Sequence, residues 1–204
     1  MTDARPLRRT CTCQRCPRFR SDALLIQPAA GIAVWLGASL VVVADGRRGL
    51  ATGIALSTLG LAVLALVSAG PLAAAAVAVG GAAAAARRFS AGADRWEVLA
   101  PGSTPRLVLC VATALVGFWI ADAVTSGPVA SLRFALLTGI ALPTARVLST
   151  AEQAAQLSAV AIVALCIASV GAVGSSSPGV WPYLAGGAVA AVVGWLPLRR
   201  PSAA

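Results

Sequence analysis

Seven long apolar runs divide the chain, and short polar segments separate them. A membrane-spanning helix needs about 20 apolar residues, because it rises about 1.5 Å per residue through a hydrocarbon core about 30 Å thick. No run alternates apolar and polar residues as a barrel strand does, and backbone groups in lipid must find partners inside their own segment. We therefore predict an all-α fold, a polytopic transmembrane helical bundle in residues 23–198. Its seven hydrophobic helices are expected at residues 23–43, 50–69, 72–86, 107–124, 129–148, 154–173 and 180–198.

Short turns rich in serine, glycine and proline join three pairs of these runs, at residues 68–71, 126–128 and 177–179. Glycine and proline favour tight turns between regular elements. The second and third, fourth and fifth, and sixth and seventh helices are therefore expected to pair as antiparallel hairpins.

Small residues recur at every fourth position on two of the predicted helices. Such stripes let helix backbones approach closely, either within one chain or in a homo- or hetero-oligomer. The stripes are Gly49, Gly53 and Ser57, and Gly186, Ala190 and Gly194.

The composition agrees with a membrane protein and removes several kinds of chemistry. Apolar residues make up 58% of the chain and charged residues 11%, whereas an ordinary soluble domain has about 25% charged residues. All 16 basic residues are arginine. Without lysine or histidine the chain cannot form a Schiff base, a P-loop lysine contact, a Ser-His-Asp triad or an HExxH zinc site. We expect no enzymatic activity and no cofactor.

The arginines lie mainly at the ends of the apolar runs, where lipid headgroups lie, so we expect a lipid bilayer and no nucleic acid as partner. Arginine in place of lysine, beside abundant alanine and glycine, is typical of GC-rich coding, so the net charge of +9 does not by itself indicate nucleic acid. We predict that the bundle lies in a prokaryotic inner membrane.

The distribution of arginines between the connecting segments predicts the orientation. The three turns contain no arginine, whereas the intervening segments and the C-terminal end contain many arginines. An excess of arginine is typical of cytoplasmic loops. We therefore predict a cytoplasmic loop at residues 87–106 and a cytoplasmic C-terminal tail at residues 199–204. The arginines expected on this side are Arg47, Arg48, Arg87, Arg88, Arg95, Arg106, Arg146, Arg199 and Arg200.

Residues 1–22, an Arg/Cys-rich segment expected to be disordered, conflict with seven crossings, because this segment would then lie outside. Two alternatives stay open. In one, the short, alanine-rich run 72–86 does not cross, so six spans remain and both termini are cytoplasmic. In the other, residues 1–22 are not translated and all seven helices cross.

Two ionisable side chains, Asp122 and Arg133, lie in apolar runs on either side of the 126–128 turn. The hairpin would bring them to a similar depth, and a charged group at membrane depth is a candidate for function. We predict a structural salt bridge that neutralises both charges. The functional alternative is a binding site for a small charged solute, with Trp119 as one wall.

The cysteines do not form a complete metal site. Cys11, Cys13 and Cys16 could share one ion, but tetrahedral zinc needs four ligands and the chain has no histidine. Cys110 and Cys166 lie inside predicted spans and are expected to pack as small apolar residues. We therefore expect no bound metal, with the three tail cysteines as the remaining candidates.

Two functions fit these observations. One is a non-enzymatic integral membrane protein, a subunit that packs with partners or with itself through its small-residue faces. The other is a small permease for an apolar or weakly polar solute. The scarcity of polar residues inside the runs favours the first function.

Aromatic residues lie at both ends of the last predicted helix. Trp181 and Tyr183 at one end, and Trp195 at the other, are expected to lie at the membrane interfaces.

Overall fold

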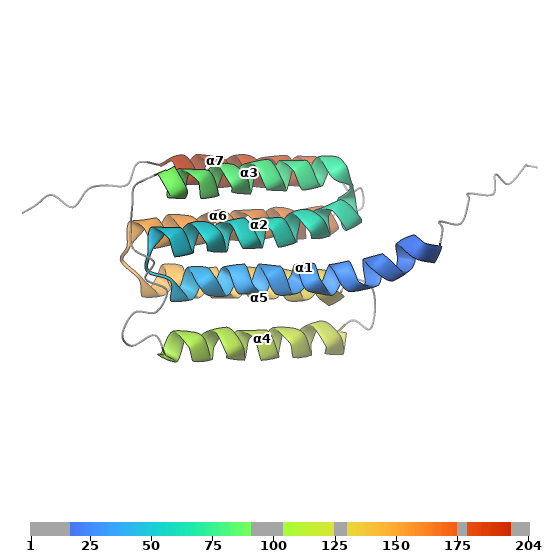
Figure 1. The fold of residues 1–204 in the computed structure, drawn as a ribbon, viewed down its shortest axis with the longest axis horizontal. Coiled ribbons are helices and arrows are strands. Elements are labelled where there is room, and N and C mark those ends of the chain that lie inside the picture. The colour runs from blue at the N-terminus through green and yellow to red at the C-terminus, as the bar shows by residue number, and fades with distance from the viewer. Residues whose placement is uncertain (1–16, 91–103, 125–129, 175–178, 197–204) are drawn as a thin grey trace, which may run out of the picture.

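A computed structural model describes residues 17–90, 104–124, 130–174 and 179–196, and in this part of the chain seven helices lie side by side (Figure 1). The described residues contain no strand. The predicted all-helical bundle is therefore confirmed. The helices are α1 (Pro17–Val43), α2 (Arg47–Ala69), α3 (Pro71–Ser90), α4 (Thr104–Val124), α5 (Ala130–Ser149), α6 (Gln153–Gly174) and α7 (Trp181–Trp195).

Successive helices run in opposite directions, which gives the bundle two distinct ends (Figure 1). Each of the three predicted hairpins packs along its length: α2 against α3, α4 against α5, and α6 against α7. Gly70 makes the turn between α2 and α3 with a φ of 95° and a ψ of −178°. This conformation is open almost only to glycine, because a Cβ would clash with the backbone.

Six of the described helices, α1 to α6, are long and apolar enough to cross a membrane, as in a multi-pass integral membrane protein. The alanine-rich α3 is one of them and extends beside α2 and α7 along the bundle (Figure 1). Helix α7 has 15 residues. Its length of about 22 Å is less than a hydrocarbon core of about 30 Å requires.

Glycines set the spacing between neighbouring helices. A Cβ on Gly37 of α1 would lie 2.3 Å from the Oγ of Ser57 on α2, and a Cβ on Gly53 would lie 2.8 Å from the carbonyl oxygen of Gly37. Likewise a Cβ on Gly194 of α7 would lie 2.7 Å from the Cα of Ala84 on α3. Residues of both predicted small-residue stripes therefore make helix contacts within this chain.

Helix α4 lies at the edge of the bundle (Figure 1). Only 17% of its most apolar stretch is buried inside the protein, against 61% for α2. Its outward side chains include Leu115, Phe118 and Trp119, each at least 67% exposed. A hydrogen bond from Nε1 of Trp35 to the carbonyl oxygen of Cys110, 3.2 Å long, ties α4 to α1.

Candidate functional site

Most charged residues of the described ranges lie at one end of the bundle, where α1, α3, α5 and α7 finish and α2, α4 and α6 begin. We call this the arginine-rich end. Two acidic residues, Asp45 and Glu152, accompany the arginines in the described part of this end. The arginines are Arg47, Arg48, Arg87, Arg88, Arg106 and Arg146. The opposite end has Arg18, Arg20, Asp22, Asp122 and Arg133.

Asp45 lies between α1 and α2, and its carboxylate accepts hydrogen bonds from two arginines of other helices. Nη1 of Arg106 lies 3.0 Å from Oδ1 and 3.2 Å from Oδ2. Nη2 of Arg146 also donates to Oδ1. These contacts span 61 and 101 residues of sequence. They join the α1–α2 junction to the beginning of α4 and the end of α5.

The three side chains of this cluster differ in their exposure to solvent. The side chain of Arg146 is 1% exposed, that of Asp45 28% and that of Arg106 35%. Nε and Nη1 of Arg146 are buried without a hydrogen-bond partner. An unpaired buried charge costs several kcal/mol, so Asp45 stabilises the burial of Arg146. The cluster therefore has a structural role in holding three parts of the chain together.

The two arginines also determine the pKa of Asp45. Burial by itself raises the pKa of this carboxyl group. The hydrogen bonds and positive charges of Arg146 and Arg106 together outweigh burial, so the net pKa lies below the ordinary value of 3.8.

This lowered pKa predicts a loss of stability in acid. A carboxyl group whose pKa is lower in the folded state stabilises the fold above its unfolded pKa, and this stabilisation is lost as the pH falls through the folded pKa. Between about pH 5 and pH 2, the melting temperature of the purified protein should therefore fall more for the wild type than for Asp45→Asn. Circular dichroism in detergent measures this difference, and equal falls for both proteins would contradict it.

The Asp45 cluster also bears on the number of crossings. Helices α2 and α3 lie between Asp45 and Arg106 in the sequence, yet these two residues meet at one end of the bundle. If the run 72–86 did not cross, Asp45 and Arg106 would lie on opposite sides of the membrane. In the structure, α3 has 20 residues and returns the chain to the same end, which disagrees with a run 72–86 that does not cross. The described helices long and apolar enough to cross number six, α1 to α6, so the choice between six and seven spans stays open. The alternative about residues 1–22 falls largely outside the described residues and stays open.

The predicted site residues Asp122 and Arg133 lie at the opposite end, on α4 and α5, and both side chains are exposed. Asp122 lines a cavity of about 200 Å³ between α1, α4 and α5, with Phe118 and Phe134 among its walls. Arg133 and the 71% exposed Trp119 are not part of this wall. The salt bridge between Asp122 and Arg133 stays a prediction.

The cysteine positions are only partly described. Cys11, Cys13 and Cys16 lie outside the described residues, so the structure does not bear on that candidate metal site. Cys110 and Cys166 are free and buried, as predicted. In the described ranges, no three side chains of His, Cys, Asp or Glu gather where they could hold a metal ion.

The aromatic residues of α7 fall into two groups. Trp181 and Trp195 are exposed at opposite ends of the helix, where interfacial residues are expected. Tyr183 is 2% exposed, so its prediction as an interfacial residue was wrong. It lies on the face of α7 that packs into the bundle, together with Gly187 and Ala190.

Comparison with models of protein families, with curated proteins and with solved structures finds no match. Function is therefore inferred from the geometry of this chain.

Proposed function

We propose that this protein is a non-enzymatic membrane subunit that joins an assembly through α4. The observation that carries the proposal is the low burial of α4, 17% of its most apolar stretch, compared with 61% for α2. Residues of both small-residue stripes already pack against other helices of the same chain. Among the six described helices that could cross a membrane, α4 therefore has the smallest buried share, and its outward face is left for a second membrane protein or a second copy.

The polarity of the interior supports a packing role over transport. Four buried hydroxyl groups each donate a hydrogen bond to the carbonyl oxygen four residues earlier in their own helix. Hydroxyl groups satisfied in this way are not oriented toward a solute path. They belong to Thr58, Thr138, Ser158 and Ser169.

The arginine-rich end supports an orientation as well. We propose that it faces the cytoplasm of a prokaryotic cell, with the protein in the inner membrane, because arginine is enriched in cytoplasmic loops. Helix α7 finishes at this end, so the C-terminus would be cytoplasmic.

Photo-crosslinking in the membrane tests the proposed role of α4. A benzophenone amino acid at Leu115 of α4, 67% exposed, should give a discrete protein adduct, whose mass tells a second copy from another protein. The matched control is the same probe at Ile167 of α6, 58% exposed, which should react with lipid only. Absence of a protein adduct at Leu115, or equal adducts at both positions, would overturn the role of α4.

A permease is the second candidate, and the cavity beside Asp122 is the observation that favours it. A carboxylate with the aromatic rings of Phe118 and Phe134 suits a small organic cation. Uptake of radiolabelled tetramethylammonium into proteoliposomes, abolished by Asp122→Asn without loss of folded protein, would support this candidate. Equal uptake by empty liposomes and proteoliposomes would exclude transport of this probe.

A further inference from the structure

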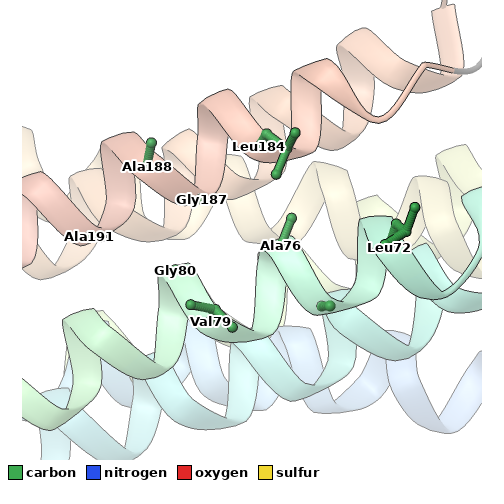
Figure 2. A pocket seen from close by; sticks show the side chains of 9 residues that line it. Leu72, Ala76, Val79, Gly80, Leu184, Gly187, Ala188 and Ala191 are labelled. Atoms are coloured by element: carbon green, nitrogen blue, oxygen red, sulfur yellow. The ribbon is translucent and has the colours of Figure 1, made fainter.

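An apolar groove of about 420 Å³ runs between α3 and α7 (Figure 2). The two helices pack side by side and run in the same direction (Figure 1). Gly80 and Gly187 bring the backbones together at its floor, because a Cβ on Gly80 would lie 2.5 Å from the Cα of Gly187. The walls include Leu72, Ala76, Val79, Leu184, Ala188 and Ala191.

The groove leads to a cation and an aromatic ring at the arginine-rich end. Arg87 follows Gly80 by seven residues on α3, and Trp195 follows Ala188 by seven residues on α7. Seven residues are about two helical turns, so both side chains lie on the same faces as the groove walls. The guanidinium carbon of Arg87 lies 5.7 Å from the centre of the Trp195 ring, which confirms that the two faces meet there.

Among the described residues, no acidic side chain forms an ion pair with the neighbouring residue Arg88. It is 3% exposed, and its Nε and Nη2 atoms are buried without a hydrogen-bond partner. The charged groups of the described residues that act on it are Arg47 and Arg87, which are also cations. A buried charge is expensive unless it is paired, so this corner of the arginine-rich end is suited to an anion.

We propose that the α3–α7 groove binds one acyl chain of an anionic phospholipid, whose phosphate group lies at Arg87 and Arg88. Basic pockets between membrane helices are suited to anionic headgroups, and Trp195 has the position of an interfacial tryptophan. From Arg87 to Leu72 the helix extends about 22 Å. This exceeds the about 15 Å of hydrocarbon in one leaflet, so the chain does not extend to Leu72. The near end of the groove at Gly80 is about 10 Å from Arg87, so a chain that starts at Arg87 reaches that part of the groove.

Native mass spectrometry of the full chain in detergent tests the proposal. Added dioleoylphosphatidylglycerol should bind with a stoichiometry of one, at least about fivefold more tightly than dioleoylphosphatidylcholine, the effect typical of one arginine at a lipid surface. Equal binding of both lipids would overturn the proposal. So would displacement of phosphatidylglycerol by inorganic phosphate at a concentration equal to that of the lipid, because the site would then bind a free anion.

Two pairs of variants separate this site from general attraction to a basic protein. Arg88→Gln and Arg87→Gln should each weaken phosphatidylglycerol binding about fivefold, whereas Arg48→Gln removes an exposed charge from the same end and should change it less than twofold. Equal losses for the three variants would overturn the headgroup site. Arg87 is exposed, so Arg87→Gln keeps the test decisive if Arg88→Gln does not fold.

The second pair tests the acyl-chain site. Ala188→Phe fills the groove from its exposed wall, and Ala185→Phe adds the same side chain at an exposed position of α7 outside the groove. Only Ala188→Phe should lower phosphatidylglycerol binding, by at least about fivefold, in a protein that still elutes as a folded species. Unchanged binding by Ala188→Phe would overturn the groove as the chain site.

Discussion

Replacing Asp45 by asparagine should destabilise the protein by about 3 kcal/mol, because it leaves the buried guanidinium of Arg146 without a counterion. Removal of one partner of a buried pair costs about 3–5 kcal/mol, and the partial exposure of Asp45, 28%, places it at the lower end of that range. Arg106 also loses its partner, which releases α4 at its attachment to the α1–α2 junction. Unfolding by dodecyl sulfate in mixed micelles measures the change.

Asp122→Asn is the matched control for this substitution. It makes the same chemical change on an exposed side chain at the opposite end of the bundle, where even the loss of the predicted salt bridge with Arg133 costs at most about 1 kcal/mol. The double variant Asp45→Asn/Arg146→Met should recover part of the loss, because an apolar side chain removes the uncompensated charge. Equal losses for Asp45→Asn and Asp122→Asn would contradict the structural role of the Asp45 cluster.

Gly37→Ala should destabilise the contact between α1 and α2 by about 1–3 kcal/mol, the range for overpacking a tight interior. Its Cβ would lie 2.3 Å from the Oγ of Ser57, 2.5 Å from the backbone nitrogen of Ser57 and 2.6 Å from the carbonyl oxygen of Gly53. Because two of these atoms belong to the backbone of α2, the clash is relieved only by moving the helices apart. The same detergent titration measures the loss.

Gly171→Ala makes the same change on α6 where space is open. The nearest atom that its Cβ would meet is the Cβ of Pro182, at 4.0 Å. Alanine is favoured over glycine inside a helix by about 0.5–1 kcal/mol, so this variant should be as stable as the wild type or more stable. A stabilising effect of Gly37→Ala would show that α1 and α2 do not approach as closely as described.

The helices could be predicted from the sequence because length and apolarity determine which segments fit a bilayer. The helix ends could not be predicted as well. Helix α2 begins at Arg47, three residues before the apolar run that starts at Leu50. Arginine is a good helix former whose long side chain extends to the interface, so a helix can continue beyond its apolar run.

The alanine-rich α3 shows why the sequence left one span undecided. Alanine contributes little to transfer into lipid, which made the six-span alternative plausible. The same small residues let α3 pack closely: a Cβ on Gly81 would lie 2.1 Å from Thr58 of α2, and Gly80 meets Gly187 of α7. The helix is therefore held largely by its neighbours, a contribution that a count of apolar residues does not include.

The Asp45 cluster was missed because its partners lie 61 and 101 residues away, and only the folded bundle brings them together. A signal was present, since Asp45 is an acidic residue beside arginines at the end of an apolar run.

The burial of Tyr183 was also missed, because it depends on the packing of α7. Tyr183 shares a helical face with Gly187 and Ala190, and that spacing, rather than its nearness to Trp181, determines its burial.

The central claim, that lipid surrounds most of this chain, is tested most directly by alkaline carbonate extraction of membranes from cells that express the full chain. We predict that the protein remains in the membrane pellet and enters solution only with detergent. Release into the carbonate supernatant as a monodisperse species would contradict the membrane-spanning bundle.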